Sequence, residues 1–177
     1  AFYGDGYFAN NIFWPKEHYI RLINFYRQRY AHYGHGEPEQ AIVGLGGQFF
    51  IRKNSQDAVK EFRPYFDNAP VYGHGPSLED FTAQTPLTVG SPQEFVEKTV
   101  AFADYFGDYQ RQLFLVDHAG LPLKIVLEQL DELGEVLPQL RAEFDARRPA
   151  NVPDAPTHAA RVAAKIAAES VEEAATV

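Results

Sequence analysis

The sequence predicts an α/β fold built on a parallel sheet, and three observations lead to this prediction. Residues 90–94 (Gly-Ser-Pro-Gln-Glu) hold an N-cap serine, a proline suited to the first helical position and a glutamate that completes a capping box. Residues 113–116 form a short apolar run that stops at Asp117 and His118, which is typical of a strand buried on both faces. Strand and helix patterns alternate along the chain, which favours parallel strands joined by right-handed crossovers.

Composition excludes several classes of protein. The 177 residues are 45% hydrophobic and 14% aromatic, so one packed domain is expected. The net charge is -8 and the basic residues are dispersed, which argues against a nucleic-acid partner. We see neither an apolar run long enough to cross a membrane nor a signal peptide, and the chain has no cysteine, so we expect a cytoplasmic protein. Because the sequence begins at Ala1 and enters a strand pattern almost at once, we expect a fragment or a processed chain.

The first predicted strand covers residues 7–12 and ends before Pro15, which restricts Trp14 to extended conformations. A long helix follows, and the glycine-rich residues 34–36 close it. Its apolar stripe consists of Tyr19, Leu22, Ile23, Tyr26, Tyr30 and Tyr33.

The second predicted strand covers residues 41–51 and has a glycine-rich centre at 44–47. Glycines inside a strand allow a bulge or a close approach of the backbone, whereas the spacing of a phosphate-binding loop is missing. Asn54 or Ser55 then caps a second helix. The irregular residues 67–88 follow, and loops of this length are commonly functional lids.

A capped helix starts at residue 91 and ends at Gly107, and it leads into the third predicted strand, residues 113–116. Residues 123–144 keep a helical rhythm in which Gly134 and Pro138 predict a kink or a break. Three strands are too few to close a barrel, so partner strands must come from lost sequence or from another chain. We assign residues 1–148 to one domain and residues 149–177 to a proline-containing linker with an alanine-rich helix or tail.

Chemistry in β/α barrels gathers at the carboxyl ends of the strands, and this rule selects the candidate residues. They are Asn10, Asn11 and Trp14 after the first strand, Gln48 on the second, Asp117 and His118 after the third, and Tyr72 and His74 in the lid-like stretch.

Structural roles for the same residues stay open. The two asparagines can satisfy turn amides, Trp14 can belong to the core, and Arg52 can be a solvated charge. Neighbouring strand residues point to opposite faces, so Asp117 and His118 seldom act as a dyad. The histidines show no metal-binding spacing and generic catalytic motifs are absent, so no metal is predicted and the catalytic residues stay unknown.

Three motifs together carry a family resemblance. Residues 90–94, 113–122 and 130–141 resemble the C-terminal section of the bacterial-luciferase-like flavin monooxygenases, and residues 5–11 with the helix that ends at 33–36 are similar to the preceding unit. The resemblance covers roughly residues 1–148. It implies that the chain is the C-terminal portion, about three β/α units, of a luciferase-like TIM barrel.

The resemblance also implies a function. Such enzymes use reduced FMN, supplied by a flavin reductase, and O2 to oxidise a small organic substrate, while some relatives use the deazaflavin F420. Asn10 and Asn11 match the strand end that faces the flavin ring, although luciferases carry a tryptophan at the position of Asn11. Residues 67–88 match the mobile active-site loop, and the family's phosphate-binding loop precedes Ala1. We therefore expect Trp14, Gln48, Tyr72, His74, Asp117 and His118 to line the pocket or its rim, and the isolated chain to be inactive.

A second hypothesis is a non-catalytic module. A shortened barrel with exposed strand edges could pair with another copy, as a homo-oligomer, or with the missing N-terminal half. An F420-dependent oxidoreductase is the third reading.

Overall fold

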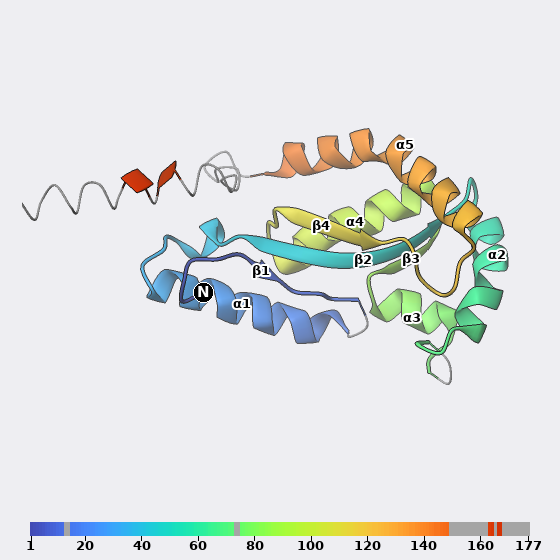
Figure 1. Cartoon of the computed structure of the whole chain (residues 1–177), viewed down its shortest axis with the longest axis horizontal. Helices are drawn as coiled ribbons and strands as arrows, with labels where there is room; N and C mark the ends of the chain where they lie inside the picture. Colours follow the sequence, from blue (N-terminus) through green and yellow to red (C-terminus); the bar gives the residue numbers. More distant parts are fainter. Residues whose placement is uncertain (13–14, 73–74, 149–162, 165, 168–177) are drawn as a thin grey trace, which may run out of the picture.

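The computed structural model describes residues 1–12, 15–72, 75–148, 163–164 and 166–167 (Figure 1). A four-stranded sheet in which every pairing is parallel confirms the predicted class. The strands are β1 (Tyr7–Phe8), β2 (Val43–Ile51), β3 (Leu87–Gly90) and β4 (Arg111–Leu115). The helices are α1 (Lys16–His32), the 3-10 helix η1 (Pro38–Gln40), α2 (Ser55–Asn68), α3 (Leu78–Gln84), α4 (Pro92–Phe106) and α5 (Leu123–Arg147).

Strand β2 is the centre of the sheet, because each of the other strands pairs with it. Gly44 is paired with β1 and β4 at once, so these two strands lie on opposite edges of β2. Gln48 is paired with β3 and β4, so β3 follows β1 along the same edge. A gap at residues 45–47 therefore separates β1 from β3 on that edge.

The local helix signals are confirmed. Ser91 Oγ accepts a hydrogen bond from Glu94 N at 3.3 Å, and Glu94 Oε2 accepts one from Ser91 N at 2.7 Å, which completes the predicted capping box of α4. Asn54 caps α2 by accepting a hydrogen bond from Asp57 N at 2.9 Å. Helix α4 ends at Gly107, whose φ is 77°.

The predicted first strand is wrong in its extent. Strand β1 covers only Tyr7–Phe8, because Asn10 adopts a φ of 48° and turns the chain out of the extended conformation. Asparagine tolerates this left-handed region better than most residues.

The irregular stretch predicted at residues 67–88 is also wrong in part, since it contains α3 and the start of β3. Ser77 caps α3 by accepting a hydrogen bond from Asp80 N at 3.1 Å. Strand β3 is short and is defined by its pairing with Gln48–Ile51 of β2, which no local pattern reveals.

Helix α5 runs through Gly134 and Pro138 as one helix, so of the predicted kink or break the break is wrong. Pro138 lacks the backbone N–H that would donate a helical hydrogen bond to the carbonyl oxygen of Gly134. The turns around it are nevertheless held by Val136 and Leu140, which are buried against β2 and α4.

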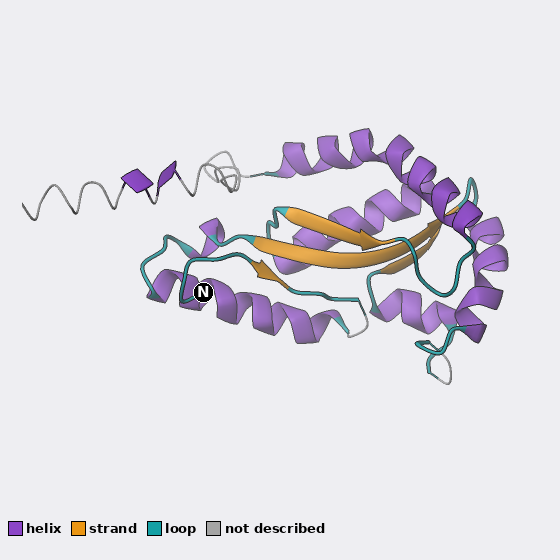
Figure 2. Ribbon diagram, in the orientation of Figure 1, coloured by secondary structure: helices purple, strands orange, loops and turns teal. Residues whose placement is uncertain are grey.

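Along most of the sheet, helices cover one face. Val43 and Leu45 pack against α1 and α4, and Phe49 and Ile51 pack against α4 and α5. Figure 2 shows α4 behind the sheet. At the carboxyl end of β2, Phe50 points to the opposite face and packs with α2 and α3 in a third cluster.

The opposite face, which we call the open face, is exposed and apolar. Phe8, Leu113 and Leu115 lie on it and are 43%, 51% and 40% exposed. The expectation that residues 113–116 are buried on both faces is therefore wrong, because the elements of this chain pack on one face of β4 only.

The tail assigned to residues 149–177 lies outside the described residues, except for residues 163–164 and 166–167, which are helical. None of the helices in the described ranges is long and apolar enough to span a membrane.

Candidate functional site

Asn10 and Asn11, at the end of β1, take different positions. Asn10 is exposed, and its carbonyl oxygen accepts a hydrogen bond from Ile12 N at 2.9 Å. Asn11 is 1% exposed, and its Oδ1 accepts a hydrogen bond from Gly46 N at 2.5 Å. The side chain of Asn11 thus replaces the backbone acceptor that β1 would offer if it continued along β2. Asn11 Nδ2 has no hydrogen-bond partner among the described residues.

Three other candidates meet at the carboxyl end of β2. Tyr72 Oη lies 3.4 Å from His118 Nδ1, and His118 Nε2 lies 3.0 Å from the carbonyl oxygen of Phe49. Gln48 is buried and forms a hydrogen bond with Tyr72, while its Oε1 lacks a partner within the described part of the chain. The structure therefore brings together Gln48, Tyr72 and His118 from three separate segments.

Burial fixes the protonation of this cluster. It lowers the pKa of His118, an effect that the Phe49 carbonyl and, more weakly, Asp117 oppose. Burial also raises the pKa of Tyr72 to about 12, and the hydrogen bond with Gln48 acts in the other direction. A neutral His118 donates its Nε2 proton to Phe49 O, which leaves Nδ1 to accept from the Tyr72 hydroxyl.

The remaining candidates are not part of this cluster. Asp117 is exposed, on the other side of the chain from the buried His118. Trp14 and His74 lie outside the described residues.

At the centre of the open face two residues of β2, Gly44 and Gly46, lack side chains, and both are buried beneath neighbouring side chains. A Cβ added to Gly44 would lie 3.2 Å from Phe8, and one added to Gly46 would lie 3.1 Å from Ile12. These spacings are tighter than ordinary contacts, so the glycines permit the close approach of the segment that follows β1. The glycine-rich pattern predicted such an approach.

Two polar residues at the end of β2 have roles that sequence reasoning missed. Gln129 is fully buried; its Oε1 accepts from Ile51 N at 2.6 Å and its Nε2 donates to Ile51 O at 3.0 Å. Arg52 contacts Glu61 at 2.6 Å and Glu128 at 3.1 Å, so it is not a merely solvated charge. A glutamine among the apolar positions of α5 was the available signal for the first role.

Comparison with known proteins places the chain in a family. A model described as luciferase-like monooxygenase matches residues 1–109. The chain belongs to this family. Among the solved structures that it resembles is the monooxygenase RslO1 from Streptomyces bottropensis, with a TM-score of 0.57 and 15% identity. The match covers 78% of this chain and 42% of that one, so this luciferase-like chain spans less than half of that relative. A search of curated proteins found no match.

The predicted family and fold class are therefore confirmed: the chain has a partial luciferase-like β/α barrel fold. In such a barrel the helices surround the strands. The helix-covered face of this luciferase-like sheet is thus the outside, and the open face belongs to the barrel interior. Members of the family use a flavin or F420.

Proposed function

We propose that this chain supplies one wall of a monooxygenase that uses reduced FMN and O2 to oxidise a small organic substrate. A separate flavin reductase would deliver the reduced FMN. The observation that carries the proposal is the open face, which is exposed and apolar and belongs to the interior of a luciferase-like barrel.

The residues of this face suit a flavin ring. A planar aromatic ring needs an apolar surface, which the exposed side chains of Phe8, Leu113 and Leu115 provide. Gln48 Oε1 is buried without a partner among the described residues and is an acceptor for a ring N–H. When bound, reduced FMN supplies the electrons that activate O2.

The chain's own residues would position the ring and exclude water from it. Leu113 and Leu115 cover it with apolar side chains, and water exclusion protects reactive species from side reactions. The neutral Tyr72–His118 pair holds a proton on Tyr72 Oη and ties the segment after β4 to the end of β2. We assign the exposed Asp117, which faces away from this pair, to the rim.

Anaerobic titration with reduced FMN tests the proposal. Leu113→Gln should weaken binding of reduced FMN, because it places a polar amide against the ring. Leu127→Gln is the matched control, since Leu127 on α5 is 53% exposed, close to the 51% of Leu113, but lies on a helix outside the open face. Because this chain supplies one wall only, we expect weak binding and no oxygenation by the 177 residues alone. Tight binding, or equal losses in the two variants, would contradict the proposal.

The same protein samples test two alternative functions. Reduced F420 replaces reduced FMN in a parallel titration, and tighter binding of F420 would favour an F420-dependent oxidoreductase. The exposure of Leu113 and Leu115 favours a self-association module as the second alternative. A dimer in solution that binds neither cofactor would support that reading.

A further inference from the structure

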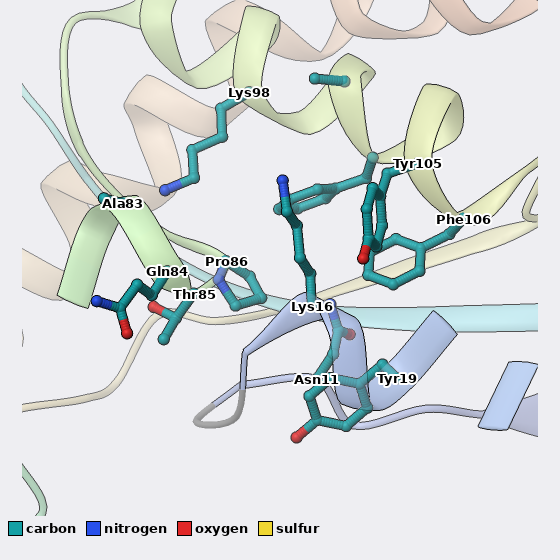
Figure 3. A pocket seen from close by; sticks show the side chains of 12 residues that line it. Asn11, Lys16, Tyr19, Ala83, Gln84, Thr85, Pro86, Lys98, Tyr105 and Phe106 are labelled. Atoms are coloured by element: carbon teal, nitrogen blue, oxygen red, sulfur yellow. The ribbon is translucent and has the colours of Figure 1, made fainter. Parts of the chain in front are cut away.

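A small cavity of about 150 Å³ lies on the outside of the sheet, between α1, α4 and the turn that joins α3 to β3 (Figure 3). Helices α1 and α4 pack on the helix-covered face, so this cavity is separate from the open face. Its walls combine aromatic rings from α1 and α4 with the polar residues Asn11, Lys16, Thr85 and Lys98.

Two ammonium groups line the cavity. Lys98 Nζ donates hydrogen bonds to the carbonyl oxygens of Thr82 and Leu87, the second at 2.6 Å. Lysine has three N–H donors, so one remains for a ligand. Lys16 Nζ lies 4.6 Å from the centre of the Tyr105 ring. Figure 3 shows the Lys98 side chain reaching toward Ala83 and the Lys16 side chain running beside the ring of Tyr105.

The two cations lack a counterion in the described structure. The salt bridges found between described residues involve neither Lys16 nor Lys98. Burial, and then the charge of Lys16, lower the pKa of Lys98 to about 8. Two like charges in a half-buried space oppose each other, and a bound anion would relieve both the repulsion and the desolvation.

Asn11 is a second, independent indication of a ligand. Its side chain is 1% exposed and lines the same cavity. Its Oδ1 is held by Gly46 N, so the amide orientation is set and Nδ2 is the group left without an acceptor among the described residues. Buried N–H donors normally have a partner. An acceptor that also carries negative charge would satisfy Asn11 and the lysines together.

We propose that this cavity binds a small oxyanion, held by Lys16, Lys98 and Asn11 Nδ2. Phosphate or a carboxylate group matches the three donors. The volume equals that of roughly five water molecules, since each water occupies about 30 Å³ in the liquid, so it admits a small anion and not a flavin or a nucleotide.

Titration of the 177-residue chain with inorganic phosphate, and separately with acetate, tests the proposal at constant ionic strength set with sodium chloride. Calorimetry measures affinity, and the side-chain NH2 signal of Asn11 in an NMR spectrum reports the site. We expect saturable binding of at least one anion with a shift of the Asn11 signal. Phosphate binding alone would indicate a tetrahedral oxyanion, and acetate binding alone a carboxylate.

Variants locate the binding. Lys16→Gln leaves the backbone hydrogen bonds of Lys98 intact and should weaken binding about tenfold or more, as expected for a lost charged hydrogen bond. Lys53→Gln changes the net charge equally at an exposed position elsewhere and should leave the affinity unchanged. The proposal is overturned by an absence of saturable binding, by an unmoved Asn11 signal, or by equal losses in the two variants.

Discussion

Asn11 Oδ1 accepts a hydrogen bond from Gly46 N at 2.5 Å, and this contact continues the β1 edge of the sheet after β1 itself has ended. The contact holds the segment between β1 and α1 against the glycine-rich centre of β2. It also leaves Asn11, which lines the proposed anion cavity, with its Nδ2 lacking a partner among the described residues.

Replacing Asn11 should destabilise the fold. Asn11→Ala leaves the buried Gly46 N–H without an acceptor, and we expect a loss of about 1–3 kcal/mol in the free energy of unfolding. Asn10→Gly is the control, because Asn10 is exposed at a φ of 48° that glycine adopts readily, so its stability should equal or exceed that of the parent. Urea unfolding measures both, and similar losses in the two variants would refute the role of Asn11.

Replacing Gln129 should lower the free energy of unfolding more than replacing Asn11 does. Gln129→Leu removes both hydrogen bonds to Ile51; it leaves the buried N–H unpaired and the carbonyl with only the 3.3 Å contact from Arg52 Nη1, which should cost about 2–5 kcal/mol. The same substitution at the exposed Gln139 of α5 should change stability by no more than about 0.5 kcal/mol. Thermal or urea unfolding measures the stability of both variants. A Gln129→Leu variant as stable as the parent would show that α5 does not depend on the two hydrogen bonds between Gln129 and Ile51.

Gly107 combines backbone strain with a steric limit. Its φ is 77°, and an added Cβ would lie 2.9 Å from Nη1 of Arg27. The Arg27 guanidinium is held in place, because Nη1 donates to Phe106 O and Nη2 donates to Asp108 O. Gly34 has a φ of 79° but no atom within 4 Å of such a Cβ. Gly34→Ala should therefore cost about 1–2 kcal/mol from the left-handed backbone alone. Gly107→Ala should lower the free energy of unfolding measurably more in the same denaturation assay. Equal losses in the two variants would mean that the Arg27 side chain can move aside without cost.

Stability should fall in mild acid because of His118. Burial lowers its pKa below the ordinary value of 6.5, so the unfolded chain takes up this proton before the folded chain does. The unfolded state then binds more protons, and the free energy of unfolding decreases as the pH falls from about 6.5 toward the lowered pKa of the folded state.

A neutral replacement tests this dependence. His118→Gln should flatten the stability profile across that pH window, whereas His32→Gln at the exposed end of α1 should keep the parent slope. Denaturant unfolding at a series of pH values provides the measurement. An unchanged slope in His118→Gln would show that other groups cause the acid sensitivity.

The sequence allowed the fold class and the local signals to be predicted. The Ser91–Glu94 capping box and the Asn54 cap depend on residues three apart, so they could be recognised directly. Strand β3 could not be recognised from the sequence, because its four residues are defined by pairing with β2. The break predicted at Pro138 is absent, because the tertiary packing of α5 outweighs the local cost of proline in a helix.

The candidate site was predictable in part. The rule of strand ends selected Gln48 and His118, and the lid-like stretch selected Tyr72, which the fold brings together. The inward turn of Asn11 depends on the left-handed Asn10 before it and on the Gly46 amide 35 residues later, and no local pattern contains both. The Lys16–Lys98 cavity was missed for the same reason, since its walls come from distant helices.

The central claim is that the open face lies against the flavin. Its most direct test is an NMR titration of the isotope-labelled chain with reduced FMN under anaerobic conditions. We predict that the shifted backbone signals cluster at Phe8, Gly44, Gly46, Leu113 and Leu115, with affinity too weak for turnover. Signals that shift only on the helix-covered face, or no shifts at millimolar FMN, would contradict the account.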